Sequence, residues 1–386
     1  MPTTRTTTKK NRTTFVGVDV GSRKCAACIR DSTQELGDNL LGDVVDEFEF
    51  PNTQEGRKRF LQKLRRYLNP VVVLESTGNY WRALYRDVER KGVPIMVAHP
   101  AKVKAIANAR FNNDKADARA LSHLLRLGSV PKSYVPPVGV QQKRDLLRHR
   151  EALVKQRTMM RNQVHALLAK HGIEEEFSDL FGVGGRKFLE GLKLPRLDAV
   201  VLESSLRVLD VLDREVALVE GELQQQASSD VDLLMSVPGF GYRIASLFLY
   251  EVGDYHRFPT PGHLASWIGI VPKDDSSGEV VQFGHIHKQG SRRLRWGVIQ
   301  AAHAAIASNE NIREFYERVE KRRGKKRAVV AVGHKLVKVA YVVLTTQEPS
   351  HKSDPGKVQR KVRAMRRDAQ PYPLAMVQEA EEPKTP

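Results

Sequence analysis

The sequence predicts an α/β domain, a helical coiled-coil middle and a mostly α-helical domain, in that order. Three observations support this prediction. Short apolar runs alternate with amphipathic stretches from residue 14 to about residue 130, a pattern typical of strands that alternate with helices. Three prolines at positions 131–137 end that alternation, which indicates a domain boundary. Two long segments of helical periodicity follow.

Five strands and three helices are expected in the first part. The strands are short runs rich in Val, Ile and Phe, and the helices end at glycines such as Gly92 and Gly128. Asn112 or Asn113 is suited to cap the third helix. The alternation predicts a mostly parallel sheet with helices on its faces. The strands are residues 15–20, 24–30, 44–50, 71–74 and 95–98, and the helices are residues 56–67, 80–91 and 114–127.

The middle part is expected to contain two long helices, residues 141–172 and 198–226. The second carries an apolar stripe that suits an antiparallel hairpin or an intermolecular coiled coil. The Gly-containing residues 181–185 between them are expected to be an irregular link. The stripe consists of Val201, Leu202, Leu206, Leu209, Leu212, Val216 and Val219.

These segments give a five-part organisation. Residues 1–13 are a flexible basic arm, 14–130 the α/β domain, 138–228 the coiled-coil region, 229–346 a third domain and 347–386 a charged tail. The tail is basic over residues 351–368 and acidic after them, and we expect it to be disordered or loosely attached. Our hypothesis is that it adds non-specific affinity for RNA or DNA.

The balance of charge favours a nucleic-acid partner. Lysine and arginine number 63 against 45 aspartates and glutamates, a formal net charge of +18. No apolar stretch is expected to reach membrane-spanning length, so a cytoplasmic protein associated with the nucleoid is predicted. The two cysteines, Cys25 and Cys28, cannot complete a four-ligand zinc site alone and are expected to be small apolar fillers of a strand.

Four acidic residues are candidate metal ligands. Asp19 and Glu75 end apolar strands, where an unpaired carboxylate is costly to desolvate. Asp114 and Asp117 are three residues apart and share one face of a helix. Together they could hold two Mg²⁺ (or Mn²⁺) ions, one activating a hydroxyl and the other stabilising a leaving oxygen. The alternative for the helical pair is simple complementation of the helix dipole.

A glycine-rich turn is a candidate grip on a nucleic-acid backbone. The Pro-Gly-Phe-Gly sequence that contains Gly239 and Gly241 separates two expected helices, as in a helix-hairpin-helix. Glycine permits close approach, and the N–H groups at the start of the next helix can bind phosphate without reading sequence. An ordinary helical turn is the alternative.

A serine-containing loop and a cationic segment form the third set. Ser276 and Ser277 precede Gly278. A serine can attack phosphorus when a base or metal activates it and cations neutralise the developing charge. By composition alone, Ser-Ser-Gly is equally a turn. The cations that follow are Lys288, Arg292, Arg293 and Arg295.

These three sets, in this order, resemble the DEDD-type insertion-sequence transposases of the one-ten group, which are related to pilin-gene invertases. The resemblance covers roughly residues 14–345, and the four acids fall on the family's Asp, Glu, Asp, Asp pattern. Residues 75–81, Glu-Ser-Thr-Gly-Asn-Tyr-Trp, are similar to the family's second motif. Further matches run from Pro238 through Gly269-Ile-Val-Pro and Lys288-Gln-Gly to Leu294-Arg295.

The resemblance implies more than the residues do. It implies a RuvC-like (RNase H-like) first domain, a coiled coil, and a transposase domain with the serine loop. It implies a DNA transposase and site-specific recombinase whose serine becomes joined to DNA as a phosphoserine, with Ser277 preferred and Ser276 in reserve. A structured bridge RNA would guide it to donor and target DNA, and a dimer or tetramer would assemble.

Three other functions remain open from the sequence. A RuvC-like nuclease would use the metal site for hydrolysis without strand exchange. Residues 16–22 also look like the first phosphate loop of a sugar-kinase or actin-like ATPase, although no second Asp-x-Gly-Gly turn follows. A non-catalytic nucleic-acid-binding protein would need only the glycine turn and the basic helices, and alanine at Asp19 or Asp114 would leave it functional.

Overall fold

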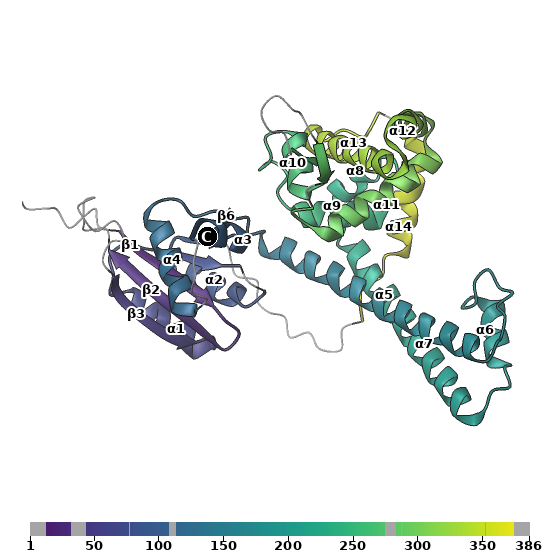
Figure 1. The fold of residues 1–386 in the computed structure, drawn as a ribbon, viewed down its shortest axis with the longest axis horizontal. Coiled ribbons are helices and arrows are strands. Elements are labelled where there is room, and N and C mark those ends of the chain that lie inside the picture. The colour runs from purple at the N-terminus through teal and green to yellow at the C-terminus, as the bar shows by residue number, and fades with distance from the viewer. Residues whose placement is uncertain are drawn as a thin grey trace, which may run out of the picture. The chain divides into compact units, whose positions relative to one another are not determined.

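The computed structural model describes residues 13–31, 44–76, 78–107, 113–274, 283–286, 288–351 and 353–373. The chain divides into two compact units, Met1–Val135 and Pro136–Pro386. The first unit is a mixed α/β sheet domain and the second is almost entirely helical (Figure 1).

The first unit is built on a six-stranded sheet with the order β3-β2-β1-β4-β5-β6. The pairs β1–β4 and β4–β5 are parallel, and the other three are antiparallel. The prediction of a mostly parallel sheet was therefore wrong. The turn between β1 and β2 is too short for the crossover that a parallel pair requires. The strands are β1 Thr14–Val20, β2 Lys24–Asp31, β3 Val44–Pro51, β4 Pro70–Glu75, β5 Ile95–Ala98 and β6 Lys132–Ser133.

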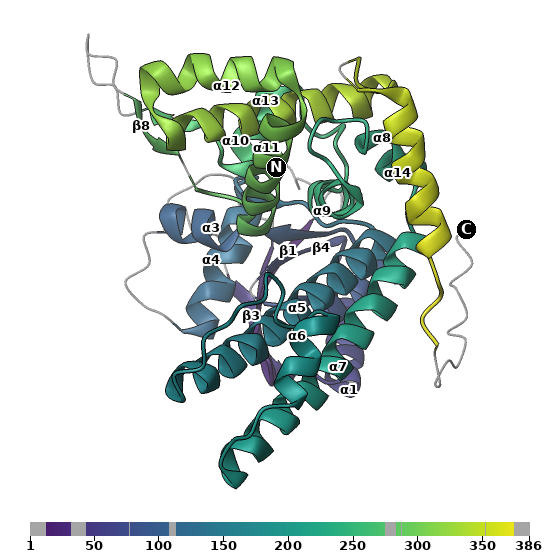
Figure 2. The ribbon, with the colours of Figure 1, turned by 90° about the vertical axis from the view of Figure 1, so that its right-hand side faces the viewer.

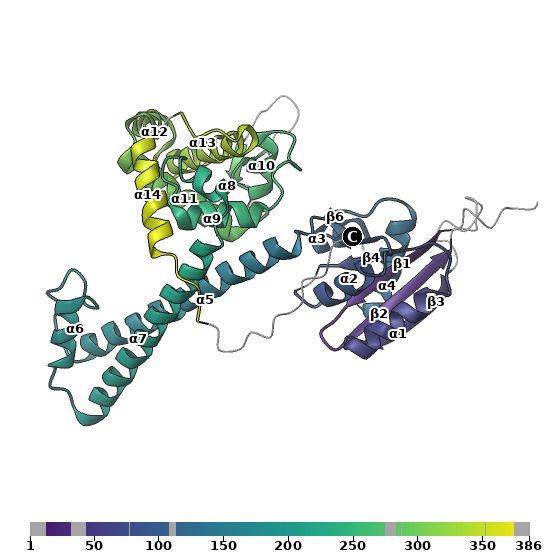
Figure 3. The same cartoon turned by 180° about the vertical axis from the view of Figure 1, so that it is seen from behind.

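Helices cover both faces of this sheet, which Figures 1 and 3 show from opposite sides. Side chains alternate along β4, so that Val72 and Leu74 pack in the cluster with α1 and α2 while Val73 packs in the cluster with α3 and α4. The sequence did not predict α3. The helices are α1 Gln54–Leu64, α2 Trp81–Glu89, α3 Pro100–Ala107 and α4 Asp114–Arg126.

The second unit begins with a long helical pair. Helix α5 (Val138–Lys170) packs along α7 (Arg196–Gln225) within the same chain. Residues 181–185 were expected to form an irregular link. Instead, Val183–Glu190 form α6, which closes the far end of the pair (Figure 1). Most of the predicted apolar stripe is buried, but Val201 is exposed.

The remaining helices share one core with the near end of α5 and α7. In Figure 2, α12 and α13 lie side by side above α11. The elements are α8 Ser229–Leu234, α9 Tyr242–Val252, α10 Pro261–Ile268, β7 Pro272–Asp274, β8 Phe283–Ile286, α11 Arg292–Ser308, α12 Glu310–Arg323, α13 Lys325–Thr346 and α14 Pro355–Asp368.

Helix α13 corrects one expectation. It is long and apolar enough to pass as a membrane span, whereas no such stretch was expected. Half of its apolar window is buried inside the structure, and Val332, Leu336, Val337 and Ala340 lie in the shared core. Such burial is typical of the central helix of a globular domain.

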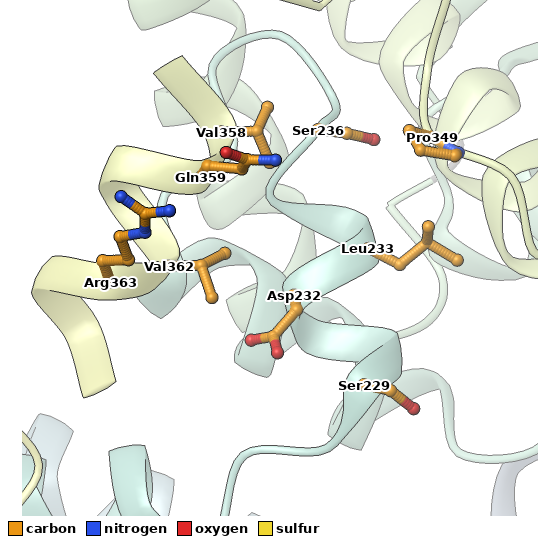
Figure 4. Close-up of a pocket in the computed structure, with 9 residues that line it drawn as sticks. All are labelled: Ser229, Asp232, Leu233, Ser236, Pro349, Val358, Gln359, Val362 and Arg363. Atoms are coloured by element: carbon orange, nitrogen blue, oxygen red, sulfur yellow. The ribbon is translucent and has the colours of Figure 1, made fainter. Parts of the chain in front are cut away.

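The expectation of a disordered or loosely attached tail was wrong for residues 355–368, which form α14. Met365 is 4% exposed in the shared core, and Arg366 pairs with Asp232 of α8 at 2.7 Å. Beside this contact, α8 and α14 line a cavity of about 510 Å³ (Figure 4). One apolar side chain in each turn of α14 is enough to dock it, although the composition of the segment is that of a solvated tail.

Candidate functional site

Two of the predicted carboxylates follow paired strands. The parallel pairing of β1 and β4 ends with Val18 opposite Leu74, so Asp19 and Glu75 are the next residues along their strands. Glu75 is 8% exposed and Asp19 is half-buried. Because the carboxyl ends of parallel strands meet at one edge of the sheet, strand direction brings these two side chains together.

Helix α4 carries the other two. Asn113 caps it by accepting a hydrogen bond from the N–H of Ala116 at 2.7 Å, and Asp114 and Asp117 lie in its first turn. The helix rests directly on β1 at Gly17, where an added Cβ would come within 2.3 Å of the carbonyl oxygen of Ala118. Alternation along β1 turns Asp19 to the same face as Gly17.

The four carboxylates act on one another electrostatically. Burial, followed by the negative charges of the other three carboxylates, raises the pKa of Asp19 to about 6. The pKa of Asp117 is also raised, by burial, by Glu75 and by Asp114, while Lys104 of α3 opposes the shift. The structure therefore brings all four predicted ligands into one electrostatic neighbourhood with excess negative charge.

This neighbourhood is not a ready coordination shell. In the part of the chain that the structure describes, no three Asp, Glu, His or Cys side chains converge closely enough to hold a metal ion. Lys24 lies between acids instead, with its Nζ 3.6 Å from Asp114 Oδ2 and 3.3 Å from Glu49 Oε1. An all-carboxylate set is of the kind that suits Mg²⁺ or Mn²⁺, and the side chain of Lys24 is exposed.

Sequence reasoning missed the residues that position this site. Gly17 permits the close approach of α4. Lys24 lies between the carboxylates of Asp114 and Glu49. Arg119 forms a two-pronged ion pair with Glu47 of β3, which ties α4 across the sheet. Arg119 follows Asp117 by two residues and gives no local signal of this role, because its partner is distant in the sequence.

The cysteines behave as predicted. Both are free and buried in β2, and burial raises the pKa of Cys25 to about 12. Cys25 packs in the cluster with α1 and α2, whereas Cys28 packs against Ala118 of α4. A separation of three residues places them on opposite faces of the strand, so they cannot share a ligand.

The two glycines of the turn in the second unit have different roles, internal packing for Gly239 and an open helix start for Gly241. Gly239 has φ +79°, and an added Cβ would lie 2.1 Å from the carbonyl oxygen of Ala301 in α11, so this glycine serves internal packing. Gly241 has open space around it and caps α9, whose first N–H groups have no side-chain cap. Gly241 is therefore the position where an anion can approach the backbone.

The cations before and within α11 also differ. Lys288 and Arg292 are exposed, and Arg293 pairs with Glu151 of α5 at 2.6 Å. Arg295 donates to the carbonyl oxygens of Ile268, Gln289 and Gly290 at 3.0–3.3 Å. Its guanidinium thus holds the connection into α11 together.

Ser276 and Ser277 lie outside the described residues, as does Gly278. The structure describes the short antiparallel strands β7 and β8 on either side of them, which pair Asp274 with Phe283.

Comparison with known proteins gives two family matches. A model described as "Transposase IS116/IS110/IS902 family" matches residues 231–317. A model for IS110 DEDD transposases, described as "Transposase", matches residues 16–173. The second range contains all four carboxylates, and the first contains the glycine turn and the cations of α11.

Individual relatives agree with these matches. The transposase for insertion sequence element IS1111A of Coxiella burnetii is 30% identical over 297 residues, which cover 72% of this chain and 78% of that protein. The "Insertion element IS110 uncharacterized 43.6 kDa protein" of Streptomyces coelicolor is 33% identical over 86% of this chain and 93% of that protein. The pilin gene-inverting protein of Moraxella bovis is 24% identical over 88% of this chain and 98% of that protein.

Proposed function

The chain belongs to the IS110 family of DEDD transposases, and from this membership we propose that it cuts and rejoins the DNA of a mobile element through a phosphoserine intermediate. The single observation that carries the proposal is the carboxylate neighbourhood of Asp19, Glu75, Asp114 and Asp117, whose excess negative charge calls for a divalent cation. We assign these four residues as metal ligands on a RuvC-like (RNase H-like) sheet. A bound Mg²⁺ or Mn²⁺ would supply Lewis-acid activation of hydroxyl and phosphate oxygens.

The chain's own residues perform the exchange. The Oγ of Ser277, with Ser276 as the alternative, attacks a DNA phosphorus atom and loses its proton. A P–Oγ bond forms, the bond from phosphorus to one deoxyribose oxygen breaks, and that oxygen leaves as a hydroxyl. A hydroxyl from the exchanged strand then attacks the phosphoserine and releases the serine. The phosphoserine conserves the bond energy, so ATP is not required.

The second unit would supply the grip on the nucleic acid. We assign the N–H groups beside Gly241 and the side chains of Lys288 and Arg292 to phosphate contacts, with the turn acting as a helix-hairpin-helix. Arg293, a candidate from the sequence, is already paired with Glu151 and is not assigned. Gly239 and Arg295 support these contacts through their own packing. The net charge of +18 supports RNA as well as DNA binding, and we propose guidance by a bridge RNA, a dimeric or tetrameric assembly, and action in the cytoplasm at the nucleoid.

A trapping assay tests the reaction. Full-length protein, its RNA, Mg²⁺ and labelled donor or target DNA are incubated, denatured and run on a gel. A labelled protein–DNA adduct is expected with the wild type and is expected to disappear with Ser277→Ala and with Asp114→Ala. Glu203→Gln is the matched control, because Glu203 is an exposed acid of α7 outside the carboxylate neighbourhood.

The other outcomes identify the competing functions. Loss of the adduct with Ser276→Ala alone would move the nucleophile by one residue. Cut DNA without an adduct in any variant would indicate a hydrolytic RuvC-like nuclease. An unchanged biological function in the Asp19→Ala and Asp114→Ala proteins would indicate a non-catalytic binding protein, and ATP hydrolysis without DNA cutting would indicate an ATPase.

A further inference from the structure

A large cleft in the second unit is lined by α5, α7, α9, α11 and α14. Its volume is about 1420 Å³, which exceeds the roughly 300–1,000 Å³ of pockets that take one drug-sized molecule. The four carboxylates, in contrast, belong to the first unit. The cleft has room for several units of a polymer.

The charges that line the cleft favour a polyanion. Seven lysines and arginines face three aspartates and glutamates in its lining. Four of these arginines are paired with acids. Lys155 of α5, Arg292 of α11 and Lys361 of α14 are exposed and form no ion pair in the part of the chain that the structure describes. Three helices that are far apart in the sequence thus each present an unneutralised cation to the same space.

An exposed indole lies among these cations. Trp296 of α11 is 58% exposed and lines the cleft. Of the other two tryptophans, Trp81 is 9% exposed and Trp267 packs against Phe258. An exposed aromatic ring in a basic groove is the arrangement on which unpaired bases stack. In a duplex the bases stack on one another, so their faces are not available to the indole.

The start of α9 opens into the same space. Gly241 lines the cleft, has no atom within 4 Å of the position of a Cβ, and precedes N–H groups without a side-chain cap. Those N–H groups can bind a phosphate of a strand that lies in the cleft. The cleft therefore combines a stacking surface, free cations and backbone donors.

We propose that this cleft binds an unpaired stretch of nucleic acid, with one base stacked on Trp296 and its phosphates beside Lys155, Arg292, Lys361 and the start of α9. The proposal rests on the proposed function for its biological setting, since strand exchange and RNA guidance both expose unpaired strands. DNA and RNA share the chemistry that the cleft recognises. The role of Trp296 is to hold the strand, and it takes no part in bond breaking.

The test is a binding measurement on the full-length Asp114→Ala protein in a chelator, so that no cutting is required. The probes are a single-stranded DNA, a single-stranded RNA of the same sequence and the corresponding DNA duplex. Trp296→Ala is expected to weaken binding of the unpaired strands about tenfold or more and to leave duplex binding within about twofold. Trp296→Phe, which keeps an aromatic face, is expected to bind within about threefold of the parent. The two single strands show whether DNA or RNA is preferred.

Charge is tested separately from stacking. Arg292→Ala and Lys361→Ala are each expected to reduce the slope of log K against log salt by about 0.7. Arg323→Ala is the matched control, because it removes an exposed cation of α12 outside the cleft lining. Its effect on the unpaired strands is expected to stay within about twofold.

Three outcomes would overturn the proposal. The first is an affinity of Trp296→Ala for the unpaired strands equal to that of its parent. The second is an equal loss of duplex binding. The third is a change in oligomeric state on Trp296→Ala without a change in strand affinity, which would identify the indole as a subunit contact. None of these depends on the trapping assay, so failure of either idea can be recognised independently.

Discussion

Single side chains set the chemistry of this protein through their neighbours. Asp19 has a raised pKa because burial and three other carboxylates oppose its charge. Glu251 of α9 shows the opposite arrangement. It is 6% exposed, yet it accepts two hydrogen bonds from Arg148 at 2.9–3.1 Å and faces the hydroxyl of Ser291, which caps α11. The charge of Asp19 is thus opposed by its neighbours, whereas the charge of Glu251 is neutralised by Arg148.

The raised pKa of Asp19 predicts a specific pH dependence. Its folded pKa of about 6 lies above the ordinary aspartate value of 3.8, so between these pH values the folded state binds a proton that the unfolded state has lost. The stabilising contribution is complete below about pH 3.8 and is lost as the pH rises through 6. We therefore expect Asp19→Asn to melt higher than the wild type at pH 8 in a chelator, with the difference shrinking toward pH 4.5. Melting temperatures measured over this pH range check the expectation.

Magnesium should reverse the order of the two melting temperatures at pH 8. At pH 8 we expect Mg²⁺ to raise the melting temperature of the wild type and to have little effect on Asp19→Asn, because the variant lacks one ligand. Equal melting temperatures in the chelator would show that the carboxylates do not repel one another as described.

The buried pair of Glu251 and Arg148 predicts a cost of truncation. Glu251→Ala leaves Arg148 and the hydroxyl of Ser291 without their acceptor, and we expect a loss of about 2 kcal/mol in the free energy of unfolding because Arg148 is partly exposed. Urea denaturation measures it. Glu203→Ala, at an exposed pair on α7, is expected to change stability by less than about 0.5 kcal/mol.

At the scale of elements, close contacts place the site. Helix α4 reaches the strand ends only because β1 has a glycine beneath Ala118. In the second unit, α11 approaches the turn at Gly239 in the same way, and α14 docks through Met365. These helices have ordinary sequences, and their positions depend on small or matching residues in other elements.

Gly17→Ala tests the seat of α4. The added Cβ would lie 2.3–2.4 Å from backbone atoms of Ala118 and Ser122, so the helix must shift. We expect a loss of about 1–3 kcal/mol in stability together with a smaller Mg²⁺-induced rise in melting temperature, since Asp114 and Asp117 move with the helix. Gly241→Ala, which has open space, is expected to leave stability within about 0.5 kcal/mol. A normal response to Mg²⁺ in Gly17→Ala would contradict this account.

The whole molecule consists of two units with separate cores. The carboxylates belong to the first, and the cationic cleft and the residues on either side of the serine segment belong to the second. The acidic cluster and the cationic cleft therefore belong to different units of the same chain. Such units are expected to unfold independently unless a large interface couples them.

Calorimetry of the full chain is therefore expected to show two unfolding transitions. Gly17→Ala should lower one of them, and Met365→Ala should lower the other, with a cost of about 2–5 kcal/mol for the cavity left in the second core. A single transition shifted by both variants would show that the units fold as one. Truncation after residue 346 would remove part of the second core, so the contribution of α14 to RNA binding is better tested by Lys361→Ala.

Local patterns in the sequence were sufficient for much of this description. The strand ends that carry Asp19 and Glu75, the cap at Asn113 and the helical pair of α5 and α7 depend on neighbouring residues and on periodicity, which a single chain displays directly. The motifs also indicated the transposase family correctly. The nucleophilic serine and the bridge RNA stay predictions.

Only the tertiary structure decided the rest. Several features join residues that are distant in the sequence. They are the ion pair of Lys24 with Asp114, the packing of α4 on Gly17, the hydrogen bond from Arg295 to the carbonyl of Ile268, the docking of α14 and the cleft around Trp296. The composition predicted that lysines and arginines would bind nucleic acid. It did not show which of these side chains are already paired with acids or hydrogen-bonded to carbonyl oxygens. That distinction depends on packing, because a charge is available to a ligand only where folding leaves it unpaired and exposed.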